Sequence, residues 1–271
     1  MGTTYELPHA ALLSLPSKAQ DCIERLRLHE PEKVDLSGYP VTKLAAVLIL
    51  LYEKAGELRV LLTTRSKSLR AHPGQTALPG GKVDTTDANV VVTAYREAFE
   101  EVGLPLNCPD VHTVCIMRPF LSSSKLFVTP IVALLSNLSI LDQLVPSEAE
   151  PLVPKGSKDW LYEPDYHSTS DIFLSWLGNS TYRMHRFRSS ASPIKGLTSD
   201  ILIAAAEIAY DRQPAYERYS PGQLEGFAPI LRILEAELDV QHAASGTSTP
   251  TPKIEIGVQT SHASTVFTRS N

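Results

Sequence analysis

The sequence has little of several features that would each define a class of protein. It carries three cysteines in 271 residues. They have neither metal-ligand spacing nor an even number for pairing, which excludes a disulfide framework and a cysteine zinc site. The net charge of −5 gives no basic field for nucleic acid. No apolar run reaches the roughly 18 residues of a membrane span. The apolar content of 43% is sufficient for one globular domain with a substantial core.

The two ends of the chain and its composition predict its organisation. The first residues, MGTTYELPHAALLSLPSK, lack a charged start followed by a long apolar core. We therefore expect no secretory signal and an intracellular protein. The last three residues are not the Ser-Lys-Leu peroxisomal address. We expect an N-terminal extension with a short helix (1–40), one domain (41–240) and a disordered tail (241–271), because large apolar side chains are scarce there.

The most informative stretch is residues 78–104, LPGGKVDTTDANVVVTAYREAFEEVGL. We expect a tight turn at residues 79–81 and a helix at about residues 88–102. Asp87 is the expected N-cap, because a short carboxylate can accept the first amide hydrogens of a helix. Three acidic residues at i, i+3 and i+4 share one helix face: Glu97, Glu100 and Glu101. Folding alone does not require adjacent like charges, so they indicate a hard divalent cation bound by oxygen ligands.

Apolar patterns predict further elements on both sides of this stretch. Aliphatic or alternating runs predict strands at residues 43–52, 58–64, 112–117, 127–135 and 182–187. Helical spacing predicts helices at residues 17–28 and 201–210, and one more within residues 222–240, around APILRILEAELDV. Pro130 predicts an edge strand or a bulge. Thr198 or Ser199 is the expected cap of the helix at residue 201. Residues 142–171 are expected to be irregular.

Residues 65–75 form a basic segment without an acidic side chain. Its basic residues are Arg65, Lys67, Arg70 and His72. The segment is either a solvated loop or a loop that grips phosphate or carboxylate, since the arginine fork matches phosphate oxygens. The glycines at positions 80 and 81 would let a ligand approach the backbone closely.

Residues 61–104 resemble two motifs of the Nudix hydrolase family. The family box reads Gly, five residues, Glu, seven residues, then Arg-Glu-U-x-Glu-Glu-x-Gly-U, where U is aliphatic. Here it begins at Gly81 and ends with REAFEEVGL. Asp87 replaces the first Glu, and the gap to Arg96 is one residue longer. This longer gap and the upstream segment LLTTRSKSLRAHPGQ (residues 61–75) resemble the coenzyme A pyrophosphatase branch.

The resemblance implies a Nudix fold, which is an α/β (α+β) architecture with a mixed β-sheet sandwiched between helices. It also implies metal-dependent hydrolysis of the diphosphate bond of coenzyme A and its derivatives, giving 3′,5′-ADP and (acyl-)4′-phosphopantetheine. The implied ligands of Mg²⁺ or Mn²⁺ are Glu97, Glu100, Glu101 and the Gly81 carbonyl. The implied catalytic residues are Glu97, Glu100, Glu101 and Arg96, the last by orienting the glutamates. The implied substrate-binding residues are Arg65, Arg70, Gln75 and Gly80.

The implied partner is a small-molecule substrate, without nucleic acid or membrane, and the implied compartment is peroxisomal by resemblance or cytoplasmic otherwise. Two other functions stay open. One is hydrolysis of another nucleoside diphosphate derivative, such as an oxidised nucleotide or a nucleotide sugar, against which residues 61–75 argue. The other is a non-catalytic Nudix-fold binding module, because residues 142–171 lack an acidic element of the branch. Glu148 and Glu150 either replace that element or belong to an exposed acidic loop.

Overall fold

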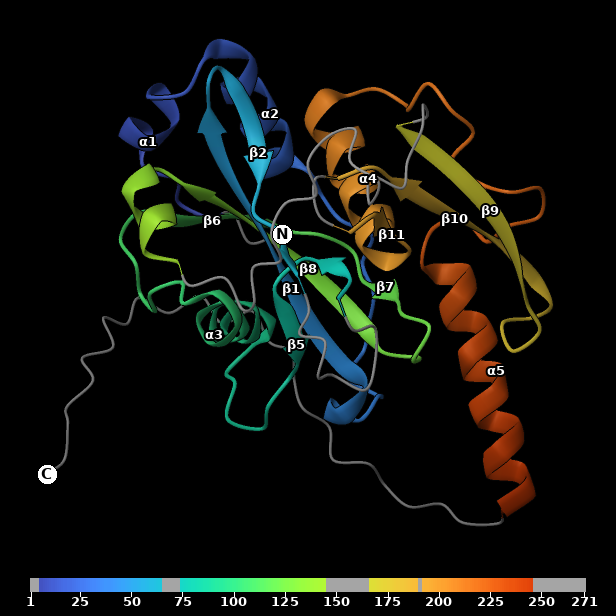
Figure 1. Ribbon diagram of the computed structural model, residues 1–271. Coiled ribbons are helices and arrows are strands. Elements are labelled where there is room, and N and C mark those ends of the chain that lie inside the picture. Colours follow the sequence, from blue (N-terminus) through green and yellow to red (C-terminus); the bar gives the residue numbers. More distant parts are fainter. Residues whose placement is uncertain (1–4, 65–73, 145–165, 190–191, 246–271) are drawn as a thin grey trace, which may run out of the picture.

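A mixed six-stranded sheet forms the centre of the computed structural model, which describes residues 5–64, 74–144, 166–189 and 192–245 (Figure 1). The strand order is β2-β1-β8-β6, with β5 also paired to β1 and β7 to β8. The strands are β1 (Leu44–Lys54), β2 (Glu57–Val60), β5 (Gly80–Lys82), β6 (Val111–Ile116), β7 (Phe120–Leu121) and β8 (Phe127–Leu135). Only β1 and β8 pair in parallel; the other pairs are antiparallel.

Helices cover both faces of this sheet (Figure 1). They are α3 (Val90–Val102) on one face, and α2 (Ser17–Leu28) with α4 (Leu197–Tyr210) on the other. Successive strand residues point to opposite faces, so Ala46 and Leu48 pack with Ala94 of α3, while Ala45 and Ile49 pack with Ile23 of α2. The aliphatic run of β1 is therefore buried on both faces. The predicted α/β sandwich around a mixed sheet is confirmed.

Smaller elements flank the central sandwich. Two further sheets have the strand orders β11-β10-β9 and β3-β4. Their strands are β3 (Thr63–Thr64), β4 (Thr76–Ala77), β9 (His167–Leu174), β10 (Ser180–Phe187) and β11 (Ile194–Lys195). The remaining helices are α1 (His9–Leu13), η1 (Val41–Lys43), η2 (Leu138–Gln143) and α5 (Ala228–Ser245). Glu32 accepts hydrogen bonds from the backbone nitrogens of Phe227 (2.9 Å) and Ala228 (2.8 Å), which ties the N-terminal segment to the start of α5.

Pro130 lies in a central strand, so the prediction of an edge strand was wrong. All nine residues of β8 are buried. The Pro130 carbonyl accepts a hydrogen bond from Met117 N at 2.9 Å, on the side of β6 and β7. The nitrogen and carbonyl of a strand residue point to the same side, so the missing N–H of Pro130 falls between the end of β6 and the start of β7. Proline is tolerated there because the ladder is already interrupted.

Other predicted boundaries also need correction. Gly80 and Gly81 lie in strand β5 and not in a turn. The predicted strand at residues 58–64 is two separate strands, β2 and β3. Strand β9 lies partly inside the region expected to be irregular, whose residues 145–165 fall outside the described ranges.

The predicted side-chain cap of α4 was wrong. Gly196 is the N-cap residue, with no side-chain hydrogen bond, and α4 begins at Leu197. The Ser199 hydroxyl instead donates to the Gly196 carbonyl at 2.7 Å and lies 3.0 Å from the His185 carbonyl. Ser199 therefore joins the start of α4 to β10. The domain boundaries at residues 40 and 240 stay predictions.

Candidate active site

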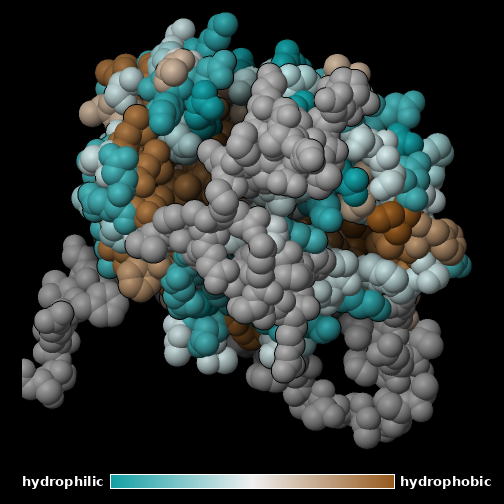
Figure 2. Space-filling view, in the orientation of Figure 1, coloured by the Kyte–Doolittle hydropathy of each residue, from teal (hydrophilic) through white to brown (hydrophobic). Residues whose placement is uncertain are grey.

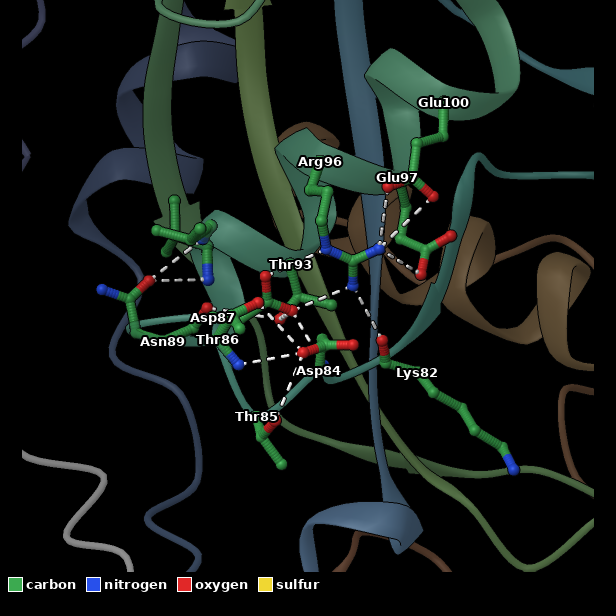
Figure 3. A network of polar contacts seen from close by, with 12 residues as sticks. Lys82, Asp84, Thr85, Thr86, Asp87, Asn89, Thr93, Arg96, Glu97 and Glu100 are labelled. Carbon is green, nitrogen blue, oxygen red and sulfur yellow. Dashed lines mark hydrogen bonds and ion pairs between the residues drawn. The ribbon is translucent and has the colours of Figure 1, made fainter. Parts of the chain in front are cut away.

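Helix α3 begins at Val90, two residues later than predicted, because Asn89 caps it. The Asn89 Oδ1 accepts hydrogen bonds from Val91 N (3.0 Å) and Val92 N (3.1 Å). The helix ends at Gly103, whose φ of 71° is left-handed and suits a residue without Cβ. The prediction of Asp87 as N-cap was wrong, since its carboxylate faces the middle of the helix (Figure 3).

Asp87 forms a bidentate ion pair with Arg96 (Figure 3). Arg96 Nε donates to Asp87 Oδ1 and Nη2 donates to Oδ2, both at 2.9 Å. The buried Thr93 hydroxyl donates to the same Oδ2 at 2.8 Å, and Asp84 N donates to it at 2.9 Å. These bonds, led by those of Arg96, lower the pKa of Asp87 although burial opposes them. The shorter acid at this position of the box therefore keeps its charge and its arginine partner.

The same guanidinium also lies against two of the three glutamates of the box. Arg96 Nη1 is 3.0 Å from Glu97 Oε1 and 3.3 Å from Glu100 Oε1. Arg96 Nη2 donates to the Lys82 carbonyl of β5 at 3.0 Å. One positive charge thus offsets the repulsion between adjacent carboxylates. Burial raises the pKa of Glu97, and the hydrogen bond from Arg96 opposes this rise.

Two glutamates of α3 meet adjacent glycines of β5. A Cβ atom at Gly81 would overlap the carboxylate of Glu97. A Cβ atom at Gly80 would overlap the backbone of β1 at Ala46 and Val47. Gly80 N donates to Glu101 Oε2 at 3.1 Å. The close approach of β5 to β1 therefore requires glycine at position 80, where the neighbouring atoms are backbone, while glycine at position 81 leaves the space that the Glu97 carboxylate occupies.

The register of β5 decides which glycine carbonyl faces the glutamates. Leu48 N donates to the Pro79 carbonyl at 2.8 Å, and Val83 N donates to the Leu44 carbonyl at 3.0 Å. Hydrogen-bonded pairs alternate along an antiparallel ladder, so the intervening Gly81 directs its carbonyl to β1. Gly80, which precedes it, directs its backbone N–H and C=O away from β1, to the side of β5 that faces α3. This geometry favours the carbonyl oxygen of residue 80 over that of residue 81 as a ligand of a metal ion.

The donors beside β5 fit a hard divalent cation by their chemistry. Within the described ranges, no three His, Cys, Asp or Glu side chains lie close enough together to hold a metal by themselves. Glu97 and Glu101 nevertheless converge on neighbouring residues of β5, and Gly81 leaves room for the Glu97 carboxylate. Mg²⁺ and Mn²⁺ favour such oxygen donors, and Mg²⁺ completes its shell with water and phosphate.

The basic segment implicated in substrate binding lies mostly outside the described ranges. Arg65 and Arg70 belong to residues 65–73, and the acidic candidates Glu148 and Glu150 also lie outside. Gln75 is described and half-buried. The next residue, Thr76, is bound to Ser192: its backbone nitrogen donates to Ser192 Oγ at 2.7 Å, and its hydroxyl donates to the Ser192 carbonyl at 2.7 Å. Strands β3 and β4, which flank the basic segment on either side, pair with each other.

Sequence reasoning missed three groups of this network: Thr93, Asn89 and the Lys82 carbonyl. A signal existed for the first two. Thr93 is a polar residue at a buried helix position, and Asn89 is a favoured capping residue directly before an apolar run. The third had no signal, because a backbone carbonyl acquires its direction only from strand register.

The class defined by this geometry is an αβα sandwich with an arginine-clamped acidic helix, and comparisons with known proteins agree. The NUDIX domain family matches residues 42–130. "Nudix hydrolase 22, chloroplastic" and "Nudix hydrolase 15, mitochondrial" of Arabidopsis thaliana are 39% and 37% identical over 184 and 185 residues. "Uncharacterized Nudix hydrolase NudL" of Yersinia pestis (strain Pestoides F) is 41% identical over 165 residues. The chain belongs to the Nudix hydrolase family.

The extent of these matches differs between the relatives. The match to NudL covers 57% of this chain and 81% of NudL. The matches to the two plant proteins cover 66% of this chain, but only 59% and 63% of those proteins. The chain thus spans less than two thirds of their length. Their names place those two proteins in the chloroplast and the mitochondrion, and none of the three names mentions the peroxisome. Among the described residues, no helix is both long and apolar enough to cross a membrane.

Proposed function

We propose that this protein hydrolyses the diphosphate bond of coenzyme A and its derivatives in a metal-dependent reaction. The products are 3′,5′-ADP and (acyl-)4′-phosphopantetheine. One water is consumed, one bridging P–O bond breaks, and two phosphomonoesters form. Family membership supports the broader class, hydrolysis of nucleoside diphosphate derivatives. The finer choice of substrate depends on residues 61–75, which resemble the coenzyme A branch.

The convergence of Glu97 and Glu101 on β5 carries the proposal for a hydrolase. Two carboxylates beside an outward-facing carbonyl form a set of oxygen donors that a binding module without metal chemistry does not need. We assign the metal ligands to Glu97, Glu100, Glu101 and the carbonyl of Gly80. Mg²⁺ or Mn²⁺ bound there supplies positive charge for a phosphorus centre and its leaving phosphate.

The other residues of the site position these donors. Arg96 holds Glu97 and Glu100 on one side and Asp87 on the other, so the glutamates are ordered before substrate binds. A carboxylate of the set accepts the proton of the attacking water. Arg65 and Arg70 would grip the phosphates of the nucleotide half, and Gln75 would be a further substrate-binding residue.

The first experiment is incubation of the purified full chain with coenzyme A and Mg²⁺ or Mn²⁺, followed by chromatography of the products. We expect 3′,5′-ADP only when metal is present. A parallel panel contains ADP-ribose, a nucleotide sugar and an oxidised nucleoside triphosphate. Faster metal-dependent hydrolysis of one of these would replace coenzyme A as the substrate. No hydrolysis of any substrate would favour the binding module.

The variant Glu101→Gln tests the site itself. It keeps the size of the side chain and an acceptor for Gly80 N, but removes the negative charge. We expect turnover to fall by roughly a hundredfold or more, with an unchanged unfolding temperature. The matched control is Glu235→Gln on α5, an exposed acid far from the box in sequence, which should keep full turnover. Full activity of the Glu101 variant would contradict the ligand assignment.

A further inference from the structure

Strand β9 forms an edge of the sheet β11-β10-β9, and most of it is exposed (Figure 1). Six of its eight residues are exposed. Phe173 is 64% exposed and Ile172 38%, and Tyr166 directly before the strand is 71% exposed. Figure 2 shows hydrophobic surface on the right side of the molecule, where Figure 1 places this hairpin. An exposed edge strand with apolar side chains is a template for another strand.

The register between β9 and β10 decides which backbone groups of β9 face outward. Arg188 N donates to the Tyr166 carbonyl at 3.0 Å, so every second residue after Tyr166 also bonds to β10. The His185 carbonyl accepts a hydrogen bond from Gly196 N, so the backbone groups of His185 point away from β9. His185 and its partner Thr169 are therefore not hydrogen-bonded to each other, and the backbone groups of Thr169 point outward. Four residues direct N–H and C=O outward: His167, Thr169, Asp171 and Phe173. Within the part of the chain that the structure describes, these outward backbone groups have no hydrogen-bond partner.

We propose that β9 pairs antiparallel with β9 of a second copy of this chain, around a two-fold axis at Ser170. In this register, His167 lies opposite the partner's Phe173, and Thr169 lies opposite the partner's Asp171. All four outward residues of each copy then form hydrogen-bonded pairs, so every outward N–H and C=O is used. A two-fold axis requires such self-complementarity, which an identical edge supplies and an unrelated peptide does not.

Charge selects the same register. The carboxylate of Asp171 already accepts a hydrogen bond from Arg183 at 2.8 Å. An axis at Asp171 would place two aspartates directly opposite each other, which is destabilising. An axis at Thr169 would place Phe173 opposite position 165, before the start of β9, so only three of the four outward residues would pair within the strand. The axis at Ser170 instead places Asp171 opposite a threonine hydroxyl and places the exposed Phe173 ring opposite an imidazole.

The dimer is expected to be weak. One pair of eight-residue strands buries less than a standard interface, so we expect a dissociation constant of about 1–100 μM. The exposed Tyr166 would lie opposite the partner's Leu174 and add apolar area at both ends of the ladder. The proposal is independent of the proposed hydrolysis, because β9 contributes no residue to the site at β5.

Sedimentation equilibrium of the purified full chain from about 1 to 300 μM tests the proposal. We expect a concentration-dependent monomer–dimer equilibrium in the native sequence and in the control Thr169→Ala. Thr169→Asp places two like charges opposite each other twice per dimer, so the dissociation constant should rise at least tenfold. Thr169→Lys places a positive charge opposite the partner's Asp171 and should keep or tighten the dimer.

Two further results decide the outcome. Thr169→Pro removes one outward N–H, which an edge strand tolerates, and should also weaken the dimer at least tenfold. Circular dichroism and thermal unfolding of each variant establish that it is folded. A monomer at every concentration would overturn the proposal, as would a dimer that neither Asp nor Pro weakens. Equal weakening by Asp and Lys would overturn this register, since it would mean that Thr169 faces its own copy.

Discussion

Gly81 and Thr93 show how two small residues position the larger charged ones of the site. Gly81 leaves the space that the Glu97 carboxylate occupies against β5. The buried hydroxyl of Thr93 donates a hydrogen bond to Asp87, and the guanidinium of Arg96 pairs with the same carboxylate. Neither small residue has the chemistry of a catalyst. Their effects on activity should therefore appear through the side chains that they position.

Gly81→Ala is expected to reduce hydrolysis by roughly tenfold to a hundredfold with little loss of stability. The new methyl group meets the end of a flexible Glu97 side chain, which can move at small cost but then leaves its position. The control Gly38→Ala has no atom within 4 Å of its new Cβ and should leave rate and stability unchanged. Initial rates and thermal unfolding measure both effects. Full activity of Gly81→Ala would show that the position of Glu97 does not matter.

Thr93→Val is expected to slow hydrolysis several-fold, because it keeps the shape of threonine but removes the hydroxyl that donates to Asp87. Thr93→Ser keeps the hydroxyl and should retain the native rate. Both changes are buried, so each should lower the free energy of unfolding by only about 1–2 kcal/mol. Initial rates at saturating metal compare the pair. Equal rates for the two variants would exclude a positioning role for Thr93.

At the scale of elements, α3 and β5 form one unit. The helix supplies the acids, and the strand supplies glycines and outward carbonyls that meet them. The helix must begin at the correct residue for this contact, and Asn89 sets that beginning. The residues between β5 and α3 contribute through Asp84, whose backbone nitrogen donates to Asp87. Changes to the start of α3 should therefore lower stability more directly than they change the chemistry.

Asn89→Ala is expected to lower the free energy of unfolding by about 1 kcal/mol, because two amide hydrogens at the start of α3 lose their acceptor. Asn89→Ser keeps a side-chain oxygen at the cap and should stay within about 0.5 kcal/mol of the native value. Urea unfolding measured by circular dichroism separates the two. An alanine variant as stable as the serine variant would contradict the capping role.

At the scale of the whole molecule, α4 joins the central sandwich to the second sheet. Its Ile201 packs in the core beside α2. Its Asp200 accepts a hydrogen bond from the Tyr182 hydroxyl of β10 at 2.7 Å. Burial raises the pKa of Asp200 to about 6, although Tyr182 and nearby arginines oppose the rise. The junction between the two sheets therefore contains a carboxyl group whose pKa is raised to about 6.

This junction predicts a pH dependence of stability. The pKa of Asp200 is higher in the folded state than its ordinary value, so the folded state binds the proton more tightly. Its stabilising contribution is present at pH 4 and is lost as the pH rises through about 6. Relative to Asp200→Asn, the native chain should lose a few kcal/mol of unfolding free energy between pH 4 and pH 7. Urea unfolding of both proteins across this range measures the difference, and a constant difference would contradict the assignment.

The local pattern of the sequence was sufficient for most elements. The aliphatic run of β1, the fully apolar β8 and the amphipathic α2 identify themselves, because burial on one or both faces requires such residues. The spacing of the box also placed the acidic residues on α3. These features depend on periodicity and composition, which a linear sequence contains.

Tertiary structure alone decided the rest. Pro130 lies in a central strand because β6 and β7 leave a gap opposite its nitrogen. Asp87 turns to Arg96 and leaves the cap to Asn89, because a buried carboxylate gains more from a guanidinium than from amide groups. The register of β5 directs a glycine carbonyl towards or away from the glutamates. In each case the partner is distant in sequence or depends on strand alignment, and such partners exist only once the chain is folded.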